Sequence, residues 1–413
     1  MTSRERIIAS IERRQPDQVP VDLGGSTVTG ISAMAYNRLK EKLGLRSATR
    51  VFDVVQQLAM VDERIIDSFH VDAVDLNRIF MDDTGWYPVT LADESRGEFP
   101  EWFRPEREEK GSFIAKDPSG RIMSRMAATG GCFDQVLFPW EQGYPESFEN
   151  ITEAFRSINW IAHSHTRYIN ISDQELRERT EKLRASTDRA LVMSGGAKLF
   201  ELGCFLRRMD NMLMDLLTDH ENLSGMLDKL LDIHLGGLEK KLNAVGDLVD
   251  VIRFGDDLGM TTGPFMDLEV FRKLFKPRYR VLCDYVKQHS NMKIFFHTCG
   301  SIRQYIPDLI EAGFDILNPV QTNCYGMDAR ELKEEFGREI TFWGGGVDTS
   351  SVLPAGTPGE VRLDVLERCE IFSRDGGFIF APIHNILPEV PPENVIAAYE
   401  AVNEFNGNRI DLS

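Results

Sequence analysis

A histidine and a cysteine stand two residues apart in His297-Thr298-Cys299-Gly300, directly after the apolar run 292–296. Residues two apart along an extended strand end point to the same side, so the imidazole and the thiol can face one space. Both groups are zinc ligands, and a catalytic zinc site takes about three protein ligands and keeps one position open. The pair therefore predicts two ligands of a zinc site and requires a third from elsewhere.

Two residues could supply the third ligand. His384 follows an apolar run near the C-terminus, and Cys324 follows another apolar run at 316–319. If these runs are strands of one barrel, both residues lie at the same rim as His297. We predict His384 as the third ligand and Cys324 as a weaker candidate. The alternative without a metal makes His297 a hydrogen-bonded rim residue and Cys299 a small apolar side chain.

Two adjacent carboxylates, Asp256 and Asp257, follow a further apolar run and are flanked by Gly255 and Gly259. Carboxylates in such a loop can serve as acid and base, bind a cationic substrate group or add a metal ligand. The alternative is one aspartate that caps a helix beside one that is solvated. We predict a catalytic role for this pair.

Loops rich in glycine and polar residues follow other apolar runs, at 22–26, 194–197 and 344–349. Glycine lets a backbone approach a ligand closely, although a tight structural turn needs it equally. The loops match neither a P-loop nor a dinucleotide fingerprint. We predict substrate binding by Asp22, Gly345, Asp348 and Asn385. His163 and His165 lie two apart in a helical stretch, do not share a helix face and are predicted to be structural.

The chain has 413 residues and a net charge of −18, so no basic stripe is expected and nucleic-acid binding is disfavoured. No apolar run approaches the roughly 18 residues that a membrane span requires, and the N-terminus lacks an apolar signal segment. The six cysteines are widely scattered, which indicates reduced thiols rather than a disulfide framework. We expect a cytoplasmic protein.

Eight short apolar runs alternate with helical patterns, which is typical of a parallel sheet covered by helices. They predict a single (β/α)8 TIM barrel over residues 1–413. An insertion at about 81–150, between the second and third strands, includes a hairpin of 113–116 with 121–125 and should lie over the carboxyl ends of the strands. The predicted strands are Val19–Leu23, Ala73–Leu76, Ala190–Met193, Val249–Phe254, Met292–Phe296, Ile316–Pro319, Ile340–Trp343 and Phe378–Ala381.

With these motifs in place, the chain resembles the uroporphyrinogen decarboxylase superfamily. The likeness covers most of the chain and is strongest after residue 250, in the segments 254–259, 275–279, 297–300, 342–349 and 387–394. This resemblance implies a (β/α)8 barrel, which agrees with the strand count, and a homodimer is plausible from it.

One branch of that superfamily consists of decarboxylases without a cofactor, which hold substrate carboxylates with an arginine-rich N-terminal motif. The corresponding loop here, 24–30, contains no arginine. The aspartate expected near the second strand is not matched either, and Asp75 is only a neighbour of that position. Substrate carboxylates would be poorly neutralised without those arginines. The decarboxylase reaction is therefore disfavoured.

The other branch consists of corrinoid-dependent methyltransferases, similar to methylcobamide:coenzyme M methyltransferase. They carry a His-x-Cys pair at the fifth strand and a cysteine after the last strand, which bind zinc. His297 and Cys299 match the pair, whereas His384 stands where those enzymes have cysteine. Histidine is a competent zinc ligand, although the decarboxylases also carry a histidine at this place.

The resemblance therefore implies a zinc-dependent methyltransferase that moves a methyl group to or from a corrinoid carried by a partner protein. The methyl donor or acceptor would be a small molecule. Two alternatives stay open: a cofactor-free decarboxylase acting on a smaller acid, and a non-catalytic barrel that binds a corrinoid or tetrapyrrole.

Overall fold

The computed structural model describes residues 1–413 except 82–84, 118, 157, 159–169 and 411–413. His163 and His165 fall outside the described residues. At the centre lies a seven-stranded parallel sheet in the order β15-β14-β13-β12-β11-β10-β3. Its curled shape gives a TIM-barrel-like mixed α/β fold. The strands are β3 (Ala73–Asp75), β10 (Ala190–Gly196), β11 (Val251–Gly255), β12 (Lys293–His297), β13 (Ile316–Asn318), β14 (Thr341–Trp343) and β15 (Phe378–Ile379).

The predicted first strand, Val19–Leu23, is reduced to an isolated bridge. Val21 bridges Phe380 in parallel, and its carbonyl accepts a hydrogen bond from the Asp72 N–H at 2.7 Å. The segment therefore connects the two ends of the sheet, beyond β15 on one side and before β3 on the other. Pro20 has no N–H to donate and shortens the ladder, so no regular strand forms.

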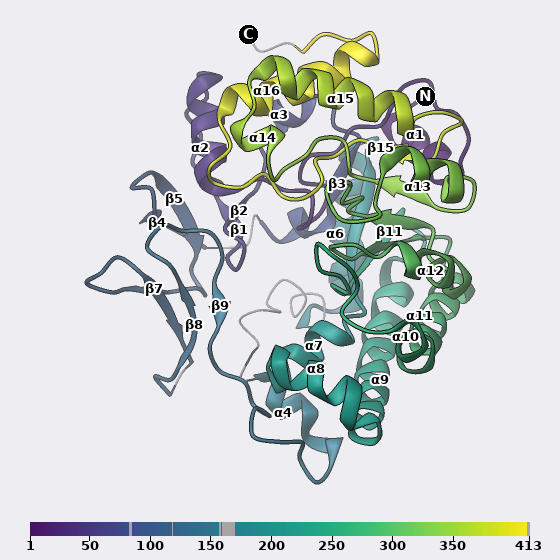
Figure 1. Ribbon diagram of the computed structural model, residues 1–413. Helices are drawn as coiled ribbons and strands as arrows, with labels where there is room; N and C mark the ends of the chain where they lie inside the picture. The colour runs from purple at the N-terminus through teal and green to yellow at the C-terminus, as the bar shows by residue number, and fades with distance from the viewer. Residues whose placement is uncertain (82–84, 118, 157, 159–169, 411–413) are drawn as a thin grey trace.

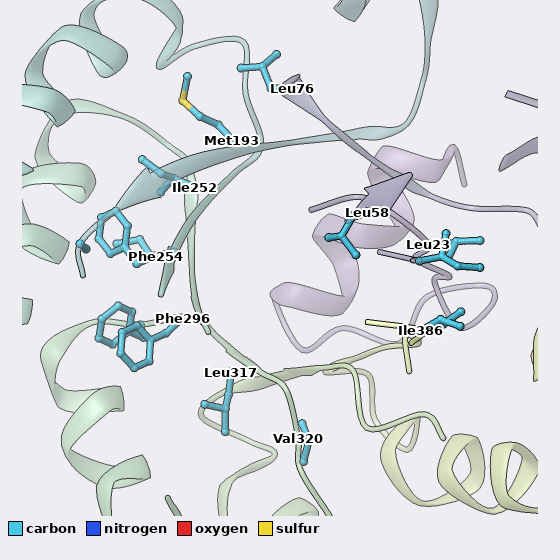
Figure 2. Close-up of a cluster of buried hydrophobic side chains, with 14 of the residues drawn as sticks. Leu23, Leu58, Leu76, Met193, Ile252, Phe254, Phe296, Leu317, Val320 and Ile386 are labelled. Carbon is cyan, nitrogen blue, oxygen red and sulfur yellow. The ribbon is translucent and has the colours of Figure 1, made fainter. Parts of the chain in front are cut away.

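Alternation along the strands separates two faces of the sheet. Ile252, Phe254 and Phe296 lie on the side that the helices cover (Figure 2), and the Phe296 ring lies 5.3 Å from that of Tyr279 in α11. The opposite side chains fill the barrel interior, where the Phe295 and Trp343 rings lie 5.3 Å apart. Residues at odd positions of β11 and β12, including His297, therefore point inward.

Helix α1 (Ser3–Ile11) covers the amino ends of the strands. Its Ile7 and Ile11 belong to the interior apolar cluster, and Arg4 N–H bonds the carbonyl of Asp188, which precedes β10. The opposite end of the barrel is therefore the one available for a site. The other α-helices surround the sheet (Figure 1) and are α2 (Ala33–Lys42), α3 (Glu63–Ser68), α4 (Ile151–Arg156), α6 (Asp173–Ser186), α7 (Phe200–Arg207), α8 (Met209–Thr218), α9 (His220–Val245), α10 (Leu268–Leu274), α11 (Lys276–His289), α12 (Ile306–Ala312), α13 (Ala329–Phe336), α14 (Val352–Ala355), α15 (Pro358–Phe372) and α16 (Pro392–Phe405).

Between β3 and β10 the chain forms short antiparallel strands beside the barrel (Figure 1). β7 pairs with β8, and this segment contacts the turn at 54–57 and helix α7: Phe133 N–H bonds Val55 O and Trp140 N–H bonds Leu206 O. Within the described ranges, no helix is long and apolar enough to cross a bilayer. The smaller elements are β1 (Val51–Asp53), β2 (Leu58–Ala59), β4 (Trp86–Thr90), β5 (Arg96–Pro100), β6 (Glu106–Arg107), β7 (Phe113–Lys116), β8 (Ile122–Met126), β9 (Asp134–Gln135) and the 3-10 turns η1 (Leu76–Phe80), η2 (Phe148–Asn150) and η3 (Arg303–Tyr305).

Candidate metal centre

His297 ends β12 on the inner face of the barrel, and its orientation is fixed by Asn318 at the end of β13. The two residues are paired across the strands, and His297 Nδ1 lies 2.6 Å from Asn318 Oδ1. Asn318 Nδ2 donates to the Trp343 carbonyl at 2.7 Å, which leaves Oδ1 as the acceptor. Nδ1 of His297 therefore carries the proton, and Nε2 presents its lone pair as a metal ligand must.

Cys299 is held by the loop that follows β12. Its N–H donates to Asp257 Oδ1 at 2.9 Å, and its Sγ lies 3.5 Å from His297 Nε2. Gly300 has φ +93°, and a Cβ there would lie 2.4 Å from the Gly259 backbone. Only glycine allows this approach, which brings the loop after β12 against the loop after β11.

His384, from the loop after β15, completes a group of three. Nitrogen and sulfur atoms of His297, Cys299 and His384 all lie within 4.8 Å of one another, and the two imidazole centroids are 5.7 Å apart. Tetrahedral zinc places its N and S ligand atoms roughly 3.3–3.8 Å apart. The donor set and the separation of His297 from Cys299 fit zinc, and a shift of about 1 Å at His384 fits the remaining distances. Among the described residues, no other group of His, Cys, Asp and Glu meets this spacing.

The protonation states suit ligation by the two histidines. Burial lowers the pKa of His297, and burial followed by the charge of His297 lowers the pKa of His384 to about 4. Both imidazoles are therefore neutral at neutral pH. Burial, and then the charge of Asp257, raises the pKa of the Cys299 thiol well above its ordinary value. A bound dication would reverse this effect, because a coordinating thiol loses its proton.

Asp257 lies at the edge of this group. Its Oδ1 is 3.6 Å from His297 Nε2, and its side chain is 39% exposed. Burial acts to raise the pKa of Asp257, but the charge of His297 and the N–H of Cys299 lower it below its ordinary value. An ionised carboxylate therefore faces the candidate metal centre, and the catalytic role of Asp257 stays a prediction.

Asp256, the other predicted catalytic residue, is placed differently. Its carboxylate is fully buried and accepts hydrogen bonds from the N–H groups of Leu199, Phe200 and Glu201 at 2.7–2.8 Å, and from the Tyr279 hydroxyl at 2.5 Å. Burial, and then the charge of Glu201, raises the pKa of Asp256 to about 7. The carboxylate caps the amino end of α7 from a neighbouring strand. This geometry matches the capping alternative, and a catalytic role for Asp256 stays an untested prediction.

The predicted substrate-binding residues Asp22 and Asn385 are buried, and their polar atoms are bonded within the protein. Asp22 accepts from the Gly25 N–H and the Trp343 indole at 2.8 Å each, and burial raises its pKa to about 6. The Asn385 side chain accepts from the Gly30 N–H at 2.7 Å and donates to two oxygens. Both side chains fix the loops at the rim, and substrate contact by them stays a prediction.

Gly345 and Asp348 also stabilise a loop, the one after β14. Gly345 has φ +83°, and a Cβ there would lie 2.9 Å from that of Val320. Asp348 accepts from the Ser350 N–H at 2.7 Å. Cys324 is not brought into the metal group: the neighbour of its Sγ is Asn323 Oδ1 at 3.9 Å. Of the two candidates for the third ligand, the structure places His384 beside the pair.

Two residues that matter to this geometry were missing from the sequence-based prediction. Asn318 was part of an expected strand, and only the register of β12 with β13 shows that it faces His297. Arg253 lies within the predicted strand 249–254, and a charge at an inward position of a strand was the available signal.

Comparison with known proteins agrees with the fold. Residues 174–405 match the family model of uroporphyrinogen decarboxylase (URO-D), which is more than half of the chain. The chain therefore belongs to the uroporphyrinogen decarboxylase family. Its structure is similar to that of a methyltransferase from Methanosarcina mazei, with a TM-score of 0.59 and 18% identity over 98% of this chain and 99% of that chain. A sequence search of curated proteins gives no match.

Proposed function

We propose that this protein is a zinc-dependent methyltransferase that moves a methyl group to or from a corrinoid carried by a partner protein. The observation that carries the proposal is the convergence of His297, Cys299 and His384 within 4.8 Å at the carboxyl ends of the strands. The family membership and the fold shared with a methyltransferase add support. The absence of arginine from the loop 24–30 weighs against a decarboxylase.

Zinc bound by the three side chains would activate a thiol acceptor, or the heteroatom of a methyl donor, as a Lewis acid. Two neighbouring residues would have separate roles. Asn318 holds the His297 ring so that Nε2 faces the site. Asp257 presents an ionised carboxylate 3.6 Å from that nitrogen and is placed to take the proton that a thiol gives up.

With a thiol acceptor, the transfer balances without a further reactant. The sulfur lone pair forms the new S–CH3 bond, the Co–C bond breaks with both electrons remaining on cobalt, and the thiol proton passes to Asp257 or to solvent. The products are a methyl thioether and cob(I)alamin. The chain must therefore orient the thiol and remove one proton.

The test is methyl transfer from free methylcobalamin to mercaptoethanol under anaerobic conditions, followed by the corrinoid spectrum and by mass detection of the thioether. Zinc-loaded wild type should accelerate the transfer, and Cys299→Ala should lower the rate by about 100-fold, since a zinc ligand is lost. Cys324→Ala is the matched control, because Cys324 lies outside the group, and it should keep the wild-type rate.

Equal rates in wild type and Cys299→Ala would contradict the proposal. Release of carbon dioxide from a small acid by the metal-free protein, with no methyl transfer, would assign the chain to the decarboxylase branch instead.

A further inference from the structure

Within the described part of the chain, the candidate metal centre holds a single thiol. His297 and His384 contribute imidazole rings and Cys299 contributes the sulfur atom, and their ligand atoms lie within 4.8 Å of one another. Cys324, the other candidate thiol, lies outside this group. A coordinating thiol loses its proton and brings one negative charge, whereas a neutral imidazole brings none. A dication held by these three side chains therefore keeps one positive charge.

The groups around the ligands leave this charge in place. His297 Nδ1 donates to the neutral amide of Asn318 at 2.6 Å, whereas a carboxylate there would make the ring a stronger donor to the metal. The Asp257 carboxylate accepts the Cys299 N–H at 2.9 Å and is not one of the three ligands. It contributes the same charge whichever residue stands at position 384. The residue at 384 therefore decides whether the ligands carry one negative charge or two.

The charge and softness of the ligands decide which atom a bound zinc ion activates best. Thiolates are soft ligands that pass electron density to the metal, which favours a sulfur substrate and makes it more nucleophilic. Imidazoles are harder and leave the metal a stronger Lewis acid, which suits an oxygen atom. A stronger Lewis acid also makes oxygen a better leaving group. Two imidazoles with one thiolate thus favour activation of a methyl donor over activation of a thiol acceptor.

We propose that His384 directs the site toward a methyl group bound to oxygen, in a methyl ether or methanol, and that this methyl group moves from the donor to the corrinoid. The inference rests on the proposed function and specifies its methyl donor and its direction. His384 is then the ligand that determines specificity. The methylated corrinoid must be consumed by a second methyl transfer, to a different acceptor.

With a methyl ether as donor, the transfer balances without a further reactant. The lone pair of cob(I)alamin forms the Co–CH3 bond, and the C–O bond breaks with both electrons remaining on oxygen. Cobalt passes formally from Co(I) to Co(III), and the oxygen takes one proton from solvent. The products are methylcobalamin and an alcohol or a phenol.

The test compares three donor sets that differ in the number of thiolates. His384→Cys has two, wild type has one and Cys299→His has none, while each set keeps three competent zinc ligands. The probes are para-nitrophenol and para-nitrothiophenol, which differ only in the atom that binds, and binding is followed by absorbance under anaerobic conditions. In the zinc-loaded proteins, the ratio of their dissociation constants should shift toward the phenol by about 10-fold for each thiolate removed.

Methyl transfer provides a second measurement, in two directions. One assay follows transfer from anisole to cob(I)alamin, and the other follows transfer from methylcobalamin to mercaptoethanol. His384→Cys should slow the first by about 10-fold and speed the second, whereas a merely damaged variant would be slower in both. Cys324→Ala is the matched control and should keep the wild-type ratio and rates, because its thiol lies outside the group. Zinc content and thermal melting are recorded for each sample.

The inference is overturned if zinc-loaded wild type and His384→Cys give the same ratio, or if His384→Cys shifts it toward the phenol. If His384→Cys folds poorly, wild type against Cys299→His decides by the same criterion. A wild type that methylates mercaptoethanol and shows no such shift contradicts this inference alone. The expected shift without methyl transfer in either direction contradicts the proposed function, and a wild type without zinc contradicts both.

Discussion

The His297 side chain shows how a single hydrogen bond prepares a ligand. Nδ1 is occupied by Asn318, whose own amide is fixed by the Trp343 carbonyl, so Nε2 is left to face Cys299. Partners of this kind set the tautomer and the orientation of metal-binding histidines. The orientation of His297 as a ligand therefore depends on Asn318, which is not itself one of the three candidate ligands.

Replacing Asn318 with leucine should lower zinc affinity by about 10–100-fold, because the ring of His297 loses its orienting acceptor. The measurement is competition with a chromogenic chelator. Asn394→Leu is the matched control: Asn394 is also buried and bonds two carbonyls, but it lies in α16, away from the centre. If both variants bind zinc as tightly as wild type does, Asn318 has no positioning role.

The two adjacent aspartates should give different effects when each is changed to asparagine. Asp256→Asn removes a carboxylate that caps α7, and should lower the free energy of unfolding by about 2–4 kcal/mol, the scale of lost charge-assisted hydrogen bonds. Asp257→Asn should cost little stability and slow methyl transfer. Chemical denaturation and the methylcobalamin assay distinguish the two. Equal stability losses would refute this division of roles.

At the site, the sequence predicted the residues whose chemistry is intrinsic and missed those whose role comes from the fold. His297, Cys299 and His384 are recognisable as ligand types that follow apolar runs, and the structure brings them together. The capping role of Asp256 was weighed only as an alternative, because its partners are more than fifty residues away in sequence. Asn318 was missed because strand register decides which residues face each other.

At the scale of elements, the loop after β10 depends on a buried histidine of α9. His234 Nδ1 accepts from the Ala197 N–H at 3.3 Å, so Nε2 carries the proton and donates to the Lys198 carbonyl at 2.8 Å. Both bonds require the neutral ring. Burial lowers the pKa of His234 to about 4, which agrees with this arrangement.

The pKa of His234 in the folded chain lies below the ordinary value of 6.5. Over the pH range between the two values, the unfolded chain binds a proton at this ring and the folded chain does not. Its contribution to stability is therefore complete above pH 6.5 and is lost as pH falls toward 4. The loss should be on the order of 2–3 kcal/mol. Denaturation across this pH range should give a flatter profile for His234→Gln than for wild type.

His289→Gln, which removes an exposed histidine from the end of α11, is the matched control and should follow the wild-type profile. A wild-type slope in His234→Gln would show that other groups carry the acid sensitivity.

Most strands could be predicted from sequence because buried parallel strands are continuous apolar runs, and seven of the eight predicted ones are found in the sheet. The remaining one, the predicted first strand Val19–Leu23, has the apolar pattern, but a proline and a following turn of glycines limit it to one bridge. An apolar pattern indicates that a segment is buried, whereas a β-ladder also needs backbone N–H donors, which proline lacks.

For the whole molecule, the two ends of the barrel have different tasks. Helix α1 closes the amino end with apolar side chains, and loops from β11, β12, β13 and β15 meet at the other end around His297. One end of the barrel thus contributes to stability and the other holds the candidate metal centre, as is general for barrels of this type.

Because the three candidate ligands come from two loops distant in sequence, zinc should stabilise the folded chain as a whole. At a zinc concentration 100-fold above the dissociation constant, the gain is about 2.7 kcal/mol, or about 3 °C in melting temperature for a chain of this size. Scanning calorimetry with zinc and with chelator checks this. His384→Ala should lose the shift, and an unchanged shift in that variant would place the metal elsewhere.

The central claim is that His297, Cys299 and His384 bind one zinc ion, and elemental analysis of the purified protein tests it most directly. After dialysis against zinc and removal of the excess, we expect about one zinc per wild-type chain and per Cys324→Ala chain. Far less than one should remain in Cys299→Ala and His384→Ala. A wild-type protein without stoichiometric zinc, or a Cys299→Ala variant that keeps it, would contradict the account.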